Sequence, residues 1–460
     1  MNAKSRRATP PSPPPSTPAT TEPRATASET ALRLLVCATA LLVPVWVSRT
    51  TIDAFRTPKL MLFQSLAALM LAVLAIGAIF HGRRFFAPLL RERRALLVTL
   101  AITLWTVVVT LTSTNRPLSV LSLTWVVACA VFFLATLLVA KRGTGMLLLG
   151  MALLPAAING ILAVLQRGAI YNPMSFHRAL PLRNQATALI GNPNDVGTYL
   201  LFPAVIALVL ALTSRGHVRA ASFVTFAACV AGMIATDTLT SIIAFLAAFA
   251  VMLILRSRKA IVPLVALGVA VALLVAAYAP VRARVLRIGN QLREGRYIEV
   301  SSMRVPAFMA AWEMFKDHPV TGVGPGGFAY WYLPYKMELN AKHPQFWMTG
   351  ENFGETHNDH LQTLAVSGLP GYLLLLAATG LLAAGSFRRR PDEAPSGETK
   401  AAGEPVTFAS RGELSRLASL PLAVAFAVAA LAQFPLELAA SAHVLLYLTA
   451  LCVAWREPAA

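Results

Sequence analysis

The sequence predicts an all-α polytopic membrane protein, and three features of the chain lead to that class. Of its 460 residues, 56% are hydrophobic and only 13% are charged, whereas a soluble domain usually carries about a quarter charged residues. Apolar runs of roughly 17–25 residues, the length that crosses a bilayer as a helix, recur along the chain. Lys and Arg gather in alternate connectors, as membrane topology requires, so the formal net charge of +19 needs no nucleic-acid partner.

Twelve membrane-spanning helices are expected, nine before a long polar connector and three after it. The apolar runs cover residues 31–48, 59–80, 95–112, 119–140, 145–165, 196–213, 220–236, 239–255, 260–279, 361–386, 415–434 and 440–456. They divide the chain into helical regions at 31–279 and 361–456, with the large connector at 280–360 between them. Residues 1–30 are rich in Pro, Ser and Thr, which predicts a disordered tail.

The basic connectors orient these helices. Arginines crowd the connector at 83–94, others open the connector at 388–390, and the tail itself is basic at 4–7. The positive-inside rule places all three segments in the cytoplasm, together with both chain ends. The connectors 166–195 and 280–360 then lie on the outer face, and connectors of such length usually carry function.

The end of the larger connector concentrates polar residues in the stretch "GETHNDH" at 354–360. Asp359 is the expected helix N-cap, with Asn358 as its competitor. The two histidines, His357 and His360, read either as interfacial residues that close a helix end or as catalytic groups. Their spacing is not that of a zinc-binding HExxH motif and no third ligand is evident, so neither a metal nor another cofactor is expected.

The helix that follows is predicted to break. A short helix over about 359–367 would end at Gly368, because Pro370 forbids smooth continuation, and the spanning helix would restart near Gly371. Broken helices at membrane depth occur where they line a protein or water cavity. The broken helix is therefore expected to line such a cavity.

A second polar signal lies upstream, at 301–331. Gly322, Gly324 and Gly327 spell G-x-G-x-x-G, but Pro325 interrupts the pattern and no βαβ context surrounds it, which excludes a dinucleotide site. Arginines precede these glycines, among them Arg304, and clustered guanidinium groups suit a phosphate-bearing ligand. The alternative is that they contact lipid headgroups.

A third signal, "GNPN" at 191–194, has the turn chemistry that opens a spanning helix. Taken together, these stretches resemble the O-antigen ligase family, which also contains O-antigen and exopolysaccharide polymerases. His357-Asn358, nine further residues and Gly368-Leu-Pro-Gly371 resemble its H-[NSQ]-x9-G-x-x-G pattern. "DHP" at 318–320 with "GVGPGGF" at 322–328, "GNPN" at 191–194 and "TPK" at 57–59 resemble its other motifs.

The resemblance implies a metal-independent glycosyltransferase with a C-superfamily-like membrane fold and a large periplasmic loop. It would transfer a glycan from undecaprenyl pyrophosphate to a hydroxyl of lipid A-core, or of a growing glycan, at the periplasmic face of the bacterial inner membrane. His357 would be catalytic. The residues implied to bind substrate are Arg304, Arg183, Arg287, Asn358, Asn192 and Asn194. The glycines implied to shape the motifs are Gly322, Gly324, Gly326, Gly368 and Gly371.

Two alternatives and one departure remain at this stage. A polymerase would use the same chemistry on another lipid-linked chain, whereas a flippase for lipid-linked oligosaccharides would be a carrier. The predicted membrane-spanning helices contain almost no ionisable residues. This disfavours the carrier, because coupled transporters bury ionisable residues in mid-span. The departure is that Ile242 and Ile243 stand where family members often have a basic residue, so either another arginine binds the phosphate or the lipid phosphate is bound differently.

Overall fold

The computed structural model describes residues 26–51, 53–141, 145–173, 181–257, 259, 261–262, 279–301, 303–344, 352–387 and 411–456. Within these ranges every regular element is a helix. The helices of the main bundle are α1 (Ala27–Leu42), α2 (Arg56–His81), α4 (Arg93–Thr112), α5 (Arg116–Lys141), α6 (Gly145–Arg167), α8 (Pro193–Thr213), α9 (Gly216–Ala235), α10 (Leu239–Arg256), α16 (Asp359–Ala383), α17 (Arg411–Ala429) and α18 (Ala439–Ala454). Short helices α3 (Arg83–Arg91) and α7 (Leu182–Gln185) lie in the connectors, and the 3-10 turn η4 (Ala384–Phe387) extends α16.

The predicted class is confirmed, since nine of the described helices are long and apolar enough to cross a membrane. These are α2, α4, α5, α6, α8, α9, α10, α16 with η4, and α17. The apolar helix α18 has only 16 residues. The total of twelve stays a prediction, because residues 263–278 of the ninth predicted run lie outside the described residues.

The first helix begins earlier than predicted. It starts at Ala27, inside the range expected for the tail, because Thr26 and Glu29 form a reciprocal capping box. In such a box each side chain satisfies a backbone N–H that has no partner within the helix. The tail residues 1–25 lie outside the described residues.

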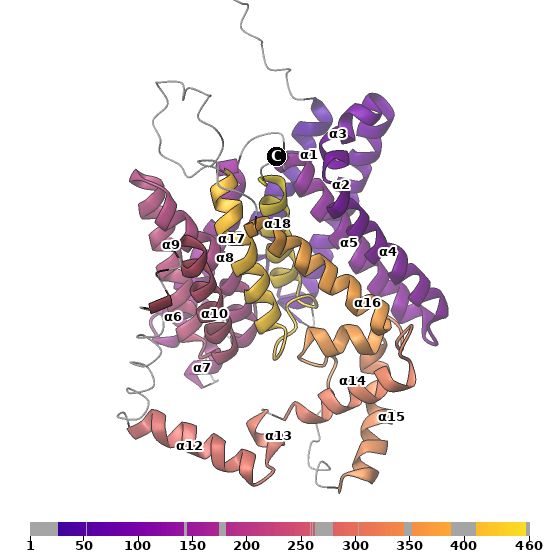
Figure 1. Ribbon diagram of the computed structural model, residues 1–460, viewed down its shortest axis with the longest axis vertical. Helices are drawn as coiled ribbons and strands as arrows, with labels where there is room; N and C mark the ends of the chain where they lie inside the picture. The colour runs from indigo at the N-terminus through magenta and orange to yellow at the C-terminus, as the bar shows by residue number, and fades with distance from the viewer. Residues whose placement is uncertain are drawn as a thin grey trace, which may run out of the picture.

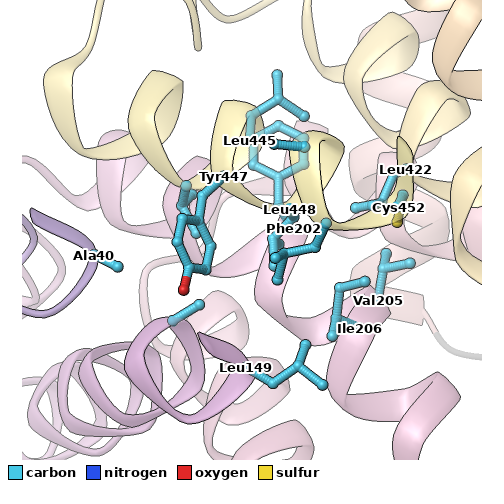
Figure 2. Packing of buried hydrophobic residues seen from close by; sticks show 14 of the residues in the cluster. Ala40, Leu149, Phe202, Val205, Ile206, Leu422, Leu445, Tyr447, Leu448 and Cys452 are labelled. Carbon is cyan, nitrogen blue, oxygen red and sulfur yellow. The ribbon is translucent and has the colours of Figure 1, made fainter. Parts of the chain in front are cut away.

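Helix α8 forms the centre of the bundle. In its most apolar 18-residue stretch 89% of the residues are buried, against 28% in α2. Figure 2 shows Phe202, Val205 and Ile206 of α8 among Leu422 of α17 and Leu448 of α18. At 21 residues, α8 is about 31 Å long, which matches the hydrocarbon core of a bilayer. The start of α8 is thereby fixed near one membrane surface.

The long connector folds against one end of this bundle. It contains α12 (Ala279–Arg293), α13 (Tyr297–Val300), α14 (Val305–Asp317) and α15 (Gly327–Lys342), which Figure 1 draws with α7 at the bottom. We call this end the loop end. A small core of its own, which includes Ala307, Met314, Phe328, Tyr332 and Ala365, joins α14 and α15 to the first turns of α16.

Contacts at the two ends agree with helices that alternate in direction. At the loop end, Lys59 Nζ donates to the backbone carbonyls of Trp46 at 2.7 Å and Leu189 at 2.6 Å, which ties two connectors together. At the opposite end, Lys141 pairs with Glu92 at 2.7 Å between their charged atoms. The arginine-rich segment 83–94 therefore lies at the end away from α14 and α15.

Candidate active site

His357 stands just before Asn358 and α16, in the last segment of the long connector. Its backbone is left-handed, with φ of 56°, a conformation that is uncommon for a residue with a side chain. Asn358, rather than the expected Asp359, is the N-cap of α16, because its backbone is extended and its Oδ1 accepts from Leu361 N at 3.0 Å.

The connector between α17 and α18, residues 430–438, binds the start of α16; we call it the strap. Asp359 N donates to Ala430 O at 3.0 Å, and the Asp359 carboxylate accepts from Leu436 N at 3.0 Å. Asn358 Nδ2 donates to Leu431 O at 3.0 Å. These bonds explain why Asp359 does not cap the helix, since its carboxylate is already bound to the strap.

Arg304 reaches the same strap from the start of α14. Its Nη1 donates to Ala432 O at 2.7 Å. Arg304 is the residue before the first turn of α14, and its backbone N–H donates to Ser301 Oγ at 3.1 Å. The strap thus holds two predicted site residues, Arg304 and Asn358, in adjacent positions.

The imidazole of His357 lies between two aromatic rings. Its centroid is 4.6 Å from that of Phe434 in the strap and 5.6 Å from that of Phe353, and both contacts are edge-to-face. The Nδ1 atom is buried and has no hydrogen-bond partner among the described residues. Packing therefore holds the ring, with one buried nitrogen left without a hydrogen-bond partner among the described residues.

The surroundings keep this imidazole neutral. Burial, and then the positive charges of Arg304 and Arg56, lower the pKa of His357 from 6.5 to about 4. In neutral imidazole one nitrogen carries no proton and accepts a hydrogen bond. At neutral pH the imidazole of His357 therefore has one unprotonated nitrogen that can accept a hydrogen bond.

Arg56, the first residue of α2, completes the cluster. Its Nη1 lies 3.3 Å from Glu355 Oε1 and its Nη2 lies 3.5 Å from Asp195 Oδ2. Its guanidinium also sits over the ring of Phe434, 5.3 Å from the centroid. Arg56 thereby joins the start of α8, which carries Asp195, to the segment that carries His357.

Two glycines allow the long connector to dock on the break in α16. Gly368 has φ of 65° inside α16, which confirms the predicted kink, and the carbonyl of Val320 occupies the place of a side chain there. Gly322 has φ of 64°, and a Cβ on it would overlap the backbone of α16 at Val366. Two backbone hydrogen bonds complete this joint between the long connector and α16. Val323 N donates to Ala365 O and Leu369 N donates to Pro319 O, both at 2.8 Å.

The remaining motif glycines permit other close approaches. A Cβ on Gly326 would lie 3.2 Å from the backbone of α5 at Leu118. Ser119 Oγ donates to Pro325 O at 2.9 Å in the same junction. A Cβ on Gly371 would lie 3.2 Å from Nε1 of Trp105 in α4. A Cβ on Gly324 would overlap the side chain of Ser113. The glycine pattern therefore fixes how the long connector and α16 pack against α4 and α5.

The start of α8 forms a neighbouring polar hollow of about 280 Å³. Asn192 caps α8, with its Oδ1 accepting from Asn194 N at 2.9 Å. Arg183 Nη2 donates to Asn194 Oδ1 at 3.4 Å, and Arg183 Nε lies 3.9 Å from Asp237 Oδ2. The structure thus brings these three predicted residues together, and Asp195 and Arg56 connect them to the His357 cluster.

Arg287 is not brought to this cluster. It is exposed on α12, which Figure 1 places at the loop end but well apart from α14 and α16. His360 serves packing: its Nε2 lies 3.1 Å from Ala427 O, and its ring contacts Tyr372. No group of three or more His, Cys, Asp or Glu residues that could hold a metal ion occurs in the described part of the chain.

The structure also reveals site residues that the sequence did not single out. Arg56 precedes the "TPK" stretch that was noticed, and its role depends on two carboxylates far away in the sequence. Phe434 belongs to the strap, where "QFPLE" at 433–437 interrupts the last apolar runs. This polar interruption was the one feature of the sequence that pointed to the strap, but it does not show which segment the strap contacts.

Fold and site together define a multi-pass α-helical membrane protein with a polar cluster of His, Arg and carboxylate side chains at one end of its bundle. A family model described as O-antigen ligase matches residues 223–376, which run from α9 past the kink of α16. The match includes Arg304, the glycine motif and His357, and it confirms the resemblance to the O-antigen ligase family, an enzyme family, over this region. Comparison with curated proteins finds no match.

Proposed function

We propose that the protein is a metal-independent glycosyltransferase that moves a glycan from undecaprenyl pyrophosphate to a hydroxyl of lipid A-core. The loop end of the bundle would face the periplasm of a bacterium, and the protein would lie in the inner membrane. The family region supports the class of reaction. The proposal depends above all on the His357 imidazole, which is buried, has no partner at Nδ1 among the described residues, and has its pKa lowered by burial and by the charges of Arg304 and Arg56.

His357 is the group that accepts the proton. The acceptor hydroxyl loses its proton to the imidazole as its oxygen attacks the anomeric carbon of the donor sugar. The bond from that carbon to the phosphate oxygen breaks, and undecaprenyl pyrophosphate leaves with the electron pair. A base that acts at the moment of attack accelerates such a reaction typically by about 10²–10⁴-fold.

The low pKa of His357 in the empty site fits this role once the donor is considered. Burial contributes most to the lowering and the charges of Arg304 and Arg56 add to it, and a bound diphosphate offsets the part that comes from these charges. An anion beside a histidine favours its protonated form and raises its pKa. A bound donor therefore opposes the charge contribution to the lowered pKa, and the imidazole stays uncharged when the site is empty.

Arg304 stabilises the leaving group. One of its amino groups is anchored to Ala432 O, and the guanidinium carries further donors in a rigid fork that matches phosphate oxygens. Burial lowers the pKa of Arg304, while the charge of Asp195 opposes that effect. Fixed donors aimed at developing charge are usually a large term in catalysis.

One reconstitution tests both the reaction and the acceptor. Purified protein in lipid nanodiscs would receive a lipid-linked glycan donor, a chelator, and either lipid A-core or a second lipid-linked glycan. We expect glycosylated lipid A-core from wild type and none from His357→Ala. Chain growth with the lipid-linked acceptor alone would make the protein a polymerase, and loss of wild-type turnover on adding chelator would overturn metal independence.

A further inference from the structure

Arg56 lies in the site, but it has no role in the reaction described above. Its backbone is fixed, because Asp53 Oδ1 accepts from the N–H groups of Phe55 at 2.8 Å and Arg56 at 3.0 Å. Its side chain extends from the start of α2 to two carboxylates on separate segments, Asp195 and Glu355. Three regions of the chain therefore position one guanidinium group.

The ion pairs leave much of the guanidinium available. The charged atoms are 3.3 and 3.5 Å apart, longer than the roughly 2.7–2.9 Å of strong charge-assisted bonds. Each carboxylate contributes a single oxygen, whereas a guanidinium carries five N–H donors. The Arg56 side chain is 44% exposed, so an incoming anion can reach it without unfolding any element.

The position of Arg56 relative to His357 indicates which anion it meets. Arg56 lies over the ring of Phe434, and His357 touches the same ring edge-to-face. Arg304 is bound to the strap two residues before Phe434. One aromatic side chain and its strap thus bring two guanidinium groups to the proton-accepting residue, and a diphosphate offers two phosphate groups.

We propose that Arg56 is a second binding residue for the diphosphate of the lipid donor, acting together with Arg304. This inference rests on the proposed function and deepens it. Asp195 and Glu355 hold the guanidinium in place while the site is empty, and phosphate oxygens replace them as partners when the donor binds. The planar fork of Arg56 favours bidentate contact with phosphate, which the ammonium group of a lysine does not provide.

The competing interpretation is that Arg56 only clamps α2 to α8 and to the segment before α16. Under that interpretation, loss of Arg56 weakens donor binding indirectly, because two unpaired carboxylates then repel the diphosphate. A neutral triple variant, Arg56→Gln with Asp195→Asn and Glu355→Gln, separates the two. It keeps the shape of the cluster and removes both the guanidinium and the repulsion.

The experiment measures binding of undecaprenyl pyrophosphate and undecaprenyl monophosphate to the full-length protein in nanodiscs. We expect wild type to prefer the diphosphate, and both Arg56→Ala and the neutral triple variant to lose that preference by at least about tenfold. Arg56→Lys should recover it in part. Arg49→Ala is the matched control, because Arg49 is exposed in the same connector, and it should behave as wild type.

The outcomes separate this inference from the proposed function. If wild type does not bind the diphosphate lipid, the proposed function fails. If wild type binds it and the neutral triple variant retains the full preference, Arg56 is only a clamp and this inference alone is overturned. Melting temperatures of all variants show which of them are folded, and Arg56→Lys decides the matter if the alanine variant does not fold.

Discussion

The rings of His357 and Phe434 meet edge-to-face with their centroids 4.6 Å apart, although they come from opposite sides of two spanning helices in the sequence. Phe434 is buried to 1% exposure, and the strap that carries it is hydrogen-bonded to Asn358, Asp359 and Arg304. The strap is therefore the structural partner of the motif that contains His357. The orientation of the imidazole depends on α17 and α18 as much as on α16.

His357→Ala should abolish transfer at normal protein abundance, with a loss of about 10²–10⁴-fold in rate. His360→Ala is the matched control, and its loss should be much smaller because His360 binds a backbone carbonyl of α17. The measurement is turnover of purified protein with a lipid-linked glycan and its acceptor. Turnover by the His357 variant at the wild-type rate would end the assignment.

The pH dependence of stability tests the environment of His357. Its pKa is lowered from 6.5 to about 4 in the folded state, so between these values the unfolded chain binds more protons. The contribution of His357 to stability is therefore complete above pH 6.5 and is lost as the pH falls toward 4. The wild type should lose melting temperature faster than His357→Gln over this window, and parallel curves would contradict the lowered pKa.

Arg304→Ala should reduce transfer by about 10²–10³-fold, the usual effect of removing one fixed donor from a site of developing charge. Arg304→Lys should be partly active at best, because an ammonium group acts as a point charge where a guanidinium forms a fork. The assay is the same turnover measurement, with membrane abundance followed in parallel. Full activity of the alanine variant would remove Arg304 from the site.

Much of the fold could be predicted from composition because each apolar run is long enough to define its own helix. The kink at Gly368 was also predictable, since Pro370 excludes a smooth helix and glycine accepts a positive φ. The cap was predicted less well. Asp359 and Asn358 are equally good caps by residue type, and the choice is made by Leu436 of the strap, which binds the Asp359 carboxylate.

The contacts between distant segments of the chain could not be predicted from the sequence. His357, Arg304 and Asn194 belong to recognisable stretches, so their types and order were visible. Arg56 was not visible as a site residue, because its role comes from Asp195 and Glu355. Arg287 has the same residue type as Arg304 but stands on α12, away from the cluster. Residue type alone does not reveal which arginines converge.

The direction of the chain in the membrane can be tested with two exposed positions at opposite ends of the bundle. Met337 of α15 is 66% exposed, and Arg84 of α3 is also exposed. With an impermeant thiol reagent on spheroplasts, we expect Met337→Cys to be labelled and Arg84→Cys to be labelled only after lysis. Wild type provides the background, since its four cysteines are buried or half-buried. The reverse pattern would invert the topology.

The last prediction concerns Gly368, where the long connector docks on α16. Gly368→Ala adds a methyl group against the carbonyl of Val320 and forces a side chain into φ of 65°. Such backbone strain alone costs about 1–3 kcal/mol, and the clash adds to it because backbone atoms cannot move aside as a flexible side chain does. The expected result is a lower melting temperature and a lower transfer rate, since α14 and Arg304 are positioned through this joint. Gly380→Ala in the same helix is the control, because its added Cβ would have no neighbour within 4 Å among the described residues outside its own helix turn, and alanine is more favourable than glycine in a helix interior by about 1 kcal/mol. Equal melting temperatures for the two variants would show that the joint between Gly368 and Val320 does not hold the site together.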